Sequence, residues 1–347
     1  MTLSTSFERV SLPLEHAFTI SRGTTETAEN VIVRIEDGDG RVGLGAAAPS
    51  AHYGETADTV EAVLPSLLAV VERVGDPHAL AEIEQGLAET VRRNPAAKAA
   101  ISIALHDLVA KRVGLPLYRY WGLDPAASVH TSYTIGIDDT ETMRRRAEAA
   151  VDRGFSVLKV KVGTGRDQEI LQAVREGAPQ ARIRVDANEA WTPREAVRTI
   201  EAIEPFDVEF VEQPVPASDP SGLRFVREHS PLPIAVDESV VTASDVPAVA
   251  DAADIVNLKL MKAGGLREAH RLIHTARAHG LSVMAGCMVE SNAAIAAAAN
   301  LAPLLDYADL DGSLLLAEDP YDGVPMPGGR IDLSSHDEPG TGAVPDG

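Results

Sequence analysis

Five charged residues recur at nearly constant intervals through the middle of the chain. Each ends a short apolar run, and they lie 25, 26, 25 and 22 positions apart: Lys161, Asp186, Glu212, Asp237 and Lys259. A single carboxylate at a strand end would indicate an ordinary ion pair or helix cap. Three at the same position of successive units instead predict a metal site, because buried carboxylates need a cation. Oxygen donors without Cys or His favour a hard cation, so we expect one Mg²⁺ per subunit.

The two lysines of this series flank the three carboxylates. Lys159 and Lys161 alternate with valine, so both point to one face of their strand. If eight strands close a barrel, the strands that end at Lys161 and Lys259 lie opposite each other, with the carboxylate strands between them. One base could then remove a proton from a carbon and the other return it from the opposite face, while the metal stabilises an enediolate. We predict that Lys161 and Lys259 are catalytic and that Lys159 supports them. Lys262 follows the strand run and is expected in a loop.

Three further polar residues follow predicted strands. Asn188 lies two positions after Asp186 on the same face, where it could orient a ligand or a metal-bound water. Asp309 and Asp311 share a face at the end of the last unit, and they could bind a second metal ion or a substrate ammonium group. For Asp311, which precedes a glycine, a turn-forming role is the alternative.

These residues belong to a regular alternation of strands and helices. From residue 129 onward, eight β-rich runs alternate with amphipathic helical segments such as 141–153, 193–204 and 266–279. The β-rich runs are Val129–Ile137, Val157–Val162, Arg182–Asn188, Val208–Gln213, Pro233–Glu238, Ile255–Leu260, Ser282–Met288 and Tyr307–Gly312. Eight such units predict an α/β fold, a (β/α)₈ TIM-like barrel, with the site at the carboxyl ends of the strands.

The rest of the chain is expected to form two other parts. Residues 1–125 predict an α+β capping domain, with a hairpin of Val31–Glu36 and Arg41–Ala46 around the turn 37–40 and helices at 56–74, 78–92 and 95–113. Residues 126–315 form the predicted barrel. Residues 316–347, rich in Pro, Gly and Asp, are expected to return to the capping domain, with a short strand at Arg330–Leu333.

Composition excludes several partners. The chain has 347 residues with 31 Lys and Arg against 52 Asp and Glu, a net charge of −21, which opposes binding to nucleic acid or to an anionic membrane. No run of 18 apolar residues predicts a membrane span. Cys287 is the single cysteine, so no internal disulfide can form, and a reducing, cytoplasmic location is expected.

Together these motifs resemble the enolase superfamily, muconate-lactonising subgroup, over nearly the whole chain. The motifs that carry the resemblance are Lys159-Val-Lys161, Asp186-Ala-Asn188, Glu212-Gln-Pro214, Asp237-Glu-Ser239 and Asn257-Leu-Lys259-Leu-Met-Lys262-Ala-Gly-Gly265. Asp309-Leu-Asp311-Gly312 is similar to the Asp-x-Asp of the dipeptide epimerases, L-Ala-D/L-Glu epimerases in particular. The resemblance implies Mg²⁺ on the three carboxylates, a lysine acid–base pair, an aspartate pair that binds the substrate ammonium, and assembly into a homo-oligomer.

The resemblance also implies that two loops of the capping domain, at about 15–28 and 48–56, close on the substrate. Arg22 could pair with a side-chain carboxylate such as that of glutamate, although a plain surface arginine is the alternative. Tyr53 could exclude water or line the side-chain pocket, and Thr134 could contact the substrate. The chain departs from many relatives at one point, because Gly43-Leu-Gly45 is followed by Ala46 where they carry glutamate.

These features predict a Mg²⁺-dependent epimerase, an isomerase that acts by 1,1-proton transfer on the C-terminal residue of an Ala-Glu-type dipeptide. The same lysine pair would serve N-acylamino acid racemisation, o-succinylbenzoate synthesis or muconate cycloisomerisation. The aspartate pair argues against those three, because their substrates lack a free ammonium group there. A Schiff-base aldolase would not need three carboxylates, a metal hydrolase would need His ligands, and a binding protein would not need the lysine pair.

Overall fold

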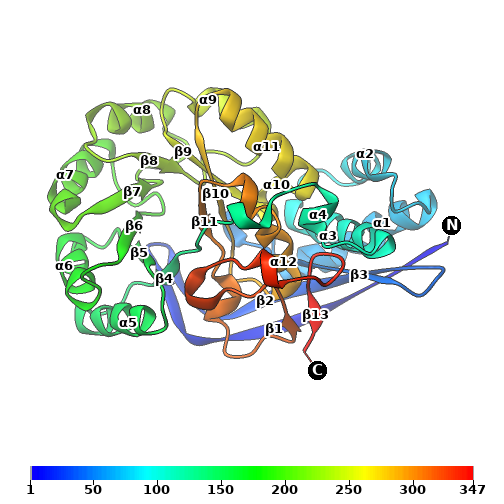
Figure 1. Ribbon diagram of the computed structural model, residues 1–347. Coiled ribbons are helices and arrows are strands. Elements are labelled where there is room, and N and C mark those ends of the chain that lie inside the picture. The colour runs from blue at the N-terminus through cyan, green and yellow to red at the C-terminus, as the bar shows by residue number, and fades with distance from the viewer. Residues whose placement is uncertain (1, 347) are drawn as a thin grey trace.

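A computed structural model describes residues 2–346, and its larger part is a barrel of eight parallel strands (Figure 1). The strands neighbour one another in chain order, as β4 (Tyr133–Ile135), β5 (Val157–Lys161), β6 (Arg182–Asp186), β7 (Val208–Glu212), β8 (Ile234–Val236), β9 (Ile255–Lys259), β10 (Ser282–Gly286) and β11 (Tyr307–Asp309). The Ser132 backbone N–H donates to Ala308 O at 3.1 Å and joins the first strand to the last. The predicted (β/α)₈ barrel is confirmed.

Helices surround the barrel, and they are α5 (Thr140–Asp152), α6 (Asp167–Gly177), α7 (Pro193–Ile203), α8 (Pro220–His229), α9 (Val246–Val249), α10 (Leu260–Ala263), α11 (Leu266–Ala278) and α12 (Asn292–Ala299). The longer ones, such as α7 and α11, carry one apolar stripe that packs on the strands, whereas α12 is buried on all sides. The first and last strands are shorter than the predicted runs. β11 ends at Asp309, so Asp311 lies beyond the strand, at the start of the 3₁₀ turn Gly312–Leu315.

The amino-terminal part is a three-stranded antiparallel sheet covered by helices. Its strands are β1 (Leu3–Ile20), β2 (Gly23–Asp37) and β3 (Val42–Ala47), and its helices are α1 (Ala57–Val74), α2 (Leu80–Thr90), α3 (Pro95–Val113) and the short α4 (Leu117–Tyr120). β3 packs so closely on α3 that a Cβ at Gly45 would stand 2.2 Å from Ala100 O. The glycines of this strand therefore serve helix packing, and Ala46 beside them is fully buried.

The first expected capping loop is mostly strand. β1 and β2 pair up to Ile20 opposite Gly23, so only the tip at Ser21 and Arg22 is a turn. This long blue hairpin extends from the capping domain to the barrel near β4 in Figure 1. There the Ile137 N–H donates to Thr19 O at 2.8 Å. The turn at the tip is thereby held at the barrel mouth by a strand rather than by a flexible loop.

The carboxyl-terminal segment crosses back to the capping domain. The Leu117 N–H donates to Gly340 O, and the Thr341 N–H donates to Asp107 Oδ1, both at 2.7 Å. The predicted strand at Arg330–Leu333 is wrong, because Arg330 makes only an isolated bridge and Leu333 begins a 3₁₀ turn. The segment instead contains the pair β12 (Tyr321–Asp322) and β13 (Val344–Pro345). Among the described residues, no helix is long and apolar enough to cross a membrane.

Candidate active site at the barrel mouth

Three buried carboxylates stand side by side at the carboxyl ends of neighbouring strands. Asp186 ends β6, Glu212 ends β7, and Asp237 directly follows β8. Asp186 and Glu212 are register partners in the sheet, so the strand ladder itself fixes their separation. The Asn257 side chain on β9 donates to Glu212 Oε1 at 2.7 Å and orients that carboxylate. The structure thus brings together the three residues that the sequence predicts as metal ligands.

Two lysines approach the carboxylates from opposite sides. Lys161 at the end of β5 places its Nζ 2.6 Å from Asp186 Oδ2. Lys259 at the end of β9 places its Nζ 2.8 Å from Asp237 Oδ2. β5 and β9 are four positions apart in the sheet of eight, so they face each other across the barrel. Burial disfavours the charge of Lys259, but the carboxylates of Asp237, Glu212 and Glu238 together outweigh burial and raise the pKa of this lysine.

Lys159 lies deeper in the barrel and joins four strands. Its Nζ is 2.6 Å from Asp309 Oδ2, 2.8 Å from Glu212 Oε2 and 3.2 Å from Asp186 Oδ2. Burial opposes its charge, but these three carboxylates outweigh burial and raise its pKa well above the usual value. This ammonium group therefore remains charged and draws the carboxylates of β6, β7 and β11 toward one point.

The donor set at the mouth fits a hard divalent cation. Glu212 Oε2 is buried and accepts no well-directed hydrogen bond within residues 2–346, although the Lys159 ammonium group lies 2.8 Å from it. Burial, followed by the charge of Asp186, raises the pKa of Glu212 to about 7. Against the effect of burial, lysines lower the pKa of Asp186 and of Asp237, so Glu212 is the carboxyl group of the three that lacks sufficient positive charge. Ligands made only of carboxylate oxygens match the preference of Mg²⁺.

Lys262 is the alternative to Lys259 in the sequence, and the two differ sharply in their surroundings. The Lys262 ammonium group donates to Asp237 Oδ1 and to three backbone carbonyls, of Asp237, Val240 and Asn257, at 2.6 to 3.0 Å. Among the described residues, the Lys259 ammonium group donates one hydrogen bond, to Asp237 Oδ2. Lys259 is 8% exposed, whereas Lys262 is 1% exposed. A fully bonded ammonium group holds a loop, whereas one with free donor capacity at the mouth can exchange a proton with a substrate.

The aspartate pair of the last unit is buried on the opposite side of the mouth. Asp309 accepts from Ser132 Oγ at 2.6 Å as well as from Lys159. Asp311 accepts from the Thr134 backbone N–H at 2.6 Å. Burial and the neighbouring Asp309 raise the pKa of Asp311 to about 7, because Lys159 compensates mainly the first of the two charges. The structure therefore places Thr134 as the backbone donor that positions Asp311.

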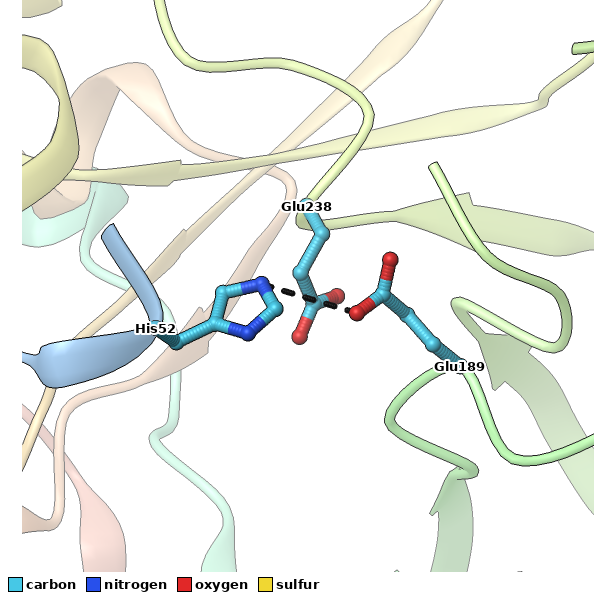
Figure 2. Close-up of side chains that lie close together, drawn as sticks. All are labelled: His52, Glu189 and Glu238. Atoms are coloured by element: carbon cyan, nitrogen blue, oxygen red, sulfur yellow. Dashed lines mark ion pairs between the residues drawn. The ribbon is translucent and has the colours of Figure 1, made fainter. Parts of the chain in front are cut away.

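The sequence did not predict the cluster that joins the capping domain to the mouth. We call Arg22, His52, Glu189 and Glu238 the lid cluster. Arg22 Nη2 is 2.8 Å from Glu238 Oε1 and its Nη1 is 3.3 Å from Glu189 Oε2, while His52 Nε2 is 3.5 Å from the same Glu189 oxygen. Figure 2 shows the Glu238 carboxyl group between the His52 ring and Glu189. The sequence motifs identified neither His52 nor Glu189, and Glu238 appeared among them only as the middle residue of Asp237-Glu-Ser239.

Asn188 connects this cluster to the carboxylates below it. Its backbone N–H donates to Asp186 Oδ1 at 2.9 Å, and its carbonyl accepts from Arg22 Nη1 at 3.1 Å. Asn188 has a φ of 45°, and Glu189 follows with 67°, both in the left-handed region. This turn carries the chain from the end of β6 up to the lid cluster. The backbone of Asn188 thus makes these contacts, while its side-chain Oδ1 is buried and accepts no hydrogen bond from a described residue.

The second capping loop is fixed from the other side of the capping domain. Glu55 Oε2 accepts from the Ala96 N–H at 3.0 Å, so this carboxylate caps the amino terminus of α3. Two residues earlier, Tyr53 places its ring edge-on to His52, with the centroids 4.9 Å apart. Tyr53 also borders a cavity of about 710 Å³ between the helices of the capping domain and the barrel.

Comparison with known proteins identifies the same architecture elsewhere. Residues 4–122 match the family model described as the mandelate racemase / muconate lactonizing enzyme N-terminal domain, and residues 142–347 match the enolase C-terminal domain-like model. An L-Ala-D/L-Glu epimerase of Bacteroides thetaiotaomicron is 38% identical over 98% of this chain and 87% of its own length. An L-Lys-D/L-Arg epimerase of Methylococcus capsulatus is 38% identical over 96% of each chain.

Solved structures agree with these sequence matches. A dipeptide epimerase from Enterococcus faecalis, in complex with Mg and the dipeptide L-Leu-L-Tyr, superposes with a TM-score of 0.90 at 35% identity. The match covers 99% of each chain.

Proposed function

The chain belongs to the enolase superfamily, in the mandelate racemase and muconate lactonizing enzyme family, and we propose from this premise that it is a Mg²⁺-dependent dipeptide epimerase. The observation that carries the proposal is the pair of buried lysines on opposite strands, with three carboxylates between them. Relatives named as dipeptide epimerases, and the bound dipeptide in one of their structures, support it.

In the proposed reaction, Lys161 and Lys259 face the two sides of one substrate carbon. The neutral form of one lysine removes the α-proton of the C-terminal residue, and the ammonium form of the other returns a proton to the opposite face. The same carbon then has the inverted configuration, and the two lysines have exchanged their protonation states. Lys159 holds positive charge beside the carboxylates throughout and partly compensates the negative charge of Asp186, Glu212 and Asp309 at the floor of the site.

Asp186, Glu212 and Asp237 would hold the metal ion. When bound, Mg²⁺ supplies positive charge that stabilises the enediolate which forms when the α-proton leaves. Asp309 and Asp311 would accept hydrogen bonds from the free ammonium group of the dipeptide. This assignment separates the proposed reaction from racemisation of N-acylamino acids, o-succinylbenzoate synthesis and muconate cycloisomerisation, in which that ammonium group is absent.

Proton NMR in D₂O with Mg²⁺ tests the proposal. With L-Ala-L-Glu and a panel of other dipeptides, we expect the α-proton signal of the C-terminal residue to disappear while the other diastereomer forms. Chelation of the metal should stop both changes, and Glu212→Gln should remove the rise in melting temperature that Mg²⁺ gives the wild type. Exchange of the α-proton in N-succinylamino acids, but in no dipeptide, would mean that the enzyme is an N-acylamino acid racemase and not a dipeptide epimerase. Trapping of the substrate by borohydride would indicate a Schiff base instead.

We also propose that the enzyme acts in the cytoplasm as a homo-oligomer. The single cysteine and the family resemblance support these two points. Light scattering of the purified protein would give the mass of the assembly, with a monomeric mass as the contrary result.

A further inference from the structure

The lid cluster contains more negative than positive charge. Its two carboxylates, Glu189 and Glu238, share one guanidinium group, that of Arg22. Arg22 is therefore already paired twice within the protein, and it also donates to Asn188 O. The expectation that Arg22 pairs with an acidic side chain of the substrate does not follow from this arrangement. An acidic side chain would add a third carboxylate to a cluster with one arginine.

One oxygen of this cluster has no partner. Glu238 has a side chain that is only 1% exposed, and its Oε2 accepts no hydrogen bond from any described residue. A buried, unpaired carboxylate oxygen is expensive and indicates a missing donor. The contacts of Glu189 Oε2 with Arg22 and His52, at 3.3 and 3.5 Å, are long for hydrogen bonds to a charged group. Both oxygens thus have capacity for a further cationic donor.

The cluster lies where the side chain of the reacting residue would point. The reacting carbon lies between Lys161 and Lys259, with its carboxylate toward the metal ligands. Glu238 directly follows one of those ligands, and Glu189 lies three residues after another. Figure 2 shows the carboxyl groups of both beside the ring of His52, which belongs to the capping domain. Asp309 and Asp311 would hold the other end of the dipeptide. The remaining direction for the side chain leads to the capping domain, where His52 and Arg22 lie.

The charged residues around His52 also indicate that the lid cluster lies close to the site of proton transfer. Besides Arg22 and Glu189, it interacts with the charges of Asp237 and Lys259, both at the site of proton transfer. One ligand atom each of His52, Glu189 and Glu238 lies within 4.8 Å of the others. When the His52 proton is on Nδ1, its Nε2 is an acceptor, and three acceptors then surround one point. An ammonium group donates three hydrogen bonds and a guanidinium group five, so either can use such a set.

We propose that Glu189, Glu238 and His52 bind the positively charged end of a lysine or arginine side chain on the residue that is epimerised. This inference rests on the proposed dipeptide epimerase function. It specifies the substrate class that the family does not settle, since relatives are named for Ala-Glu, for hydrophobic and for Lys-Arg dipeptides. The acceptor atoms are supplied by this chain's own lid cluster.

Three dipeptides whose C-terminal side chains are positive, neutral and negative test the inference. They are L-Ala-L-Lys, L-Ala-L-Met, whose side chain is unbranched and neutral, and L-Ala-L-Glu. We expect kcat/KM to be about tenfold to hundredfold higher for the lysine than for the methionine dipeptide, and lowest for the glutamate dipeptide. A wild-type enzyme that prefers the glutamate dipeptide, or does not distinguish lysine from methionine, would overturn the inference and leave the epimerase function intact. No exchange with any dipeptide would overturn both.

Charge-neutral variants locate the effect. Glu189→Gln and Glu238→Gln should each reduce the lysine-to-methionine ratio by about tenfold. Glu209→Gln is the matched control, because Glu209 pairs with Arg184 at 2.7 Å at the start of β7, the opposite end of the barrel. It should leave the ratio unchanged. A ratio that is equally insensitive to all three variants would contradict the assignment. Equilibrium dialysis would reveal a metal site instead. Two Mg²⁺ bound per chain in the wild type, and one in Glu189→Gln, would mean that the lid cluster binds a metal ion and not a substrate side chain.

Discussion

The barrel mouth and the lid cluster both pair basic side chains with carboxylates, but they are constructed in different ways. The lysines of the mouth reach carboxylates on neighbouring strands, and both partners of each pair are at least nine-tenths buried. Arg22 of the lid cluster reaches Glu238 across 216 positions of sequence and keeps 32% of its side chain exposed. Hydrogen bonds of the sheet preserve the mouth, whereas the lid cluster exists only while the capping domain lies against the barrel. In the proposed mechanism, chemistry is therefore located at the strand ends of the barrel, and substrate selection is located where the capping domain meets the barrel.

The strongest test of this contrast removes a lysine from the mouth. Lys161→Ala and Lys259→Ala should each lower epimerisation by about 10² to 10⁴-fold, the range for loss of a general acid or base. Each variant should still exchange the α-proton of one stereoisomer with solvent, because one base remains. Epimerisation and D₂O exchange can be followed in the same NMR sample. Wild-type epimerisation by either variant would remove that lysine from the mechanism.

Asp311→Asn should have the next largest effect, and only on substrates with a free ammonium group. Loss of one charged hydrogen bond lowers kcat/KM by about tenfold to hundredfold for a dipeptide. The N-acetylated form of the same dipeptide should change much less. The backbone N–H of Thr134 can still donate to the asparagine oxygen, which keeps the turn intact. Equal losses on both substrates would show that the aspartate supports the fold of the mouth rather than the ammonium group.

In the lid cluster, Arg22→Met should change KM, which reports substrate binding, more than kcat, which reports the chemical step. For a dipeptide with a neutral side chain, we expect KM to rise by up to about fivefold, because a partly exposed ion pair contributes at most about 1 kcal/mol, with a smaller change in kcat. Arg9→Met is the control, because Arg9 lies on the same hairpin and also pairs with carboxylates, Glu29 among them, but far from the barrel. A fall in kcat comparable to that of the lysine variants would place Arg22 in the reaction itself.

The smallest expected effect concerns the anchor of the second capping loop. Glu55→Ala removes the cap of α3 and should lower the free energy of unfolding by about 1 kcal/mol, as for other helix caps. Glu55→Gln retains an acceptor oxygen and should lose less. Urea unfolding gives the stability, and KM reports whether the loop with His52 and Tyr53 has moved. An unchanged KM together with reduced stability would mean that the cap stabilises the helix without positioning the loop.

The same contrast explains which parts of the site could be predicted. The residues at strand ends recur once per βα unit, so their spacing alone predicts that they meet at one end of a barrel. The partners of Arg22 have no such period. They depend on how two domains pack, and a single sequence carries no local signal for contacts between segments 166 or 216 residues apart. The sequence offered one indication that Glu189 and Glu238 belong to the site, which is that each follows a predicted metal ligand by one to three positions.

Predictions of secondary structure failed where packing outweighs local pattern. Only Leu3, Leu12 and Leu14 of the 18 residues of β1 are buried. The many polar residues concealed the strand, which is stabilised by its long pairing with β2. The β-rich residues at Arg330–Leu333 form no strand because the neighbouring Gly328 and Gly329, both with positive φ, turn the chain there. Asp311 was placed on a strand, but it begins the 3₁₀ turn that follows β11.

The long β1–β2 hairpin places Arg22 of the lid cluster far from the point where the hairpin packs on the carboxyl-terminal segment. Leu12, Leu14 and Ala28 pack on Leu316. We call this small apolar cluster the fulcrum, because a tilt of the hairpin would pivot there. From Leu14 to the tip the strand measures about 23 Å at 3.3 Å per residue, so a tilt of about 5° at the fulcrum moves the tip by about 2 Å. That displacement is enough to separate Arg22 from Glu238, which are 2.8 Å apart. Substitutions at the fulcrum should therefore change the rate at which substrate enters and product leaves, although no residue there touches either one.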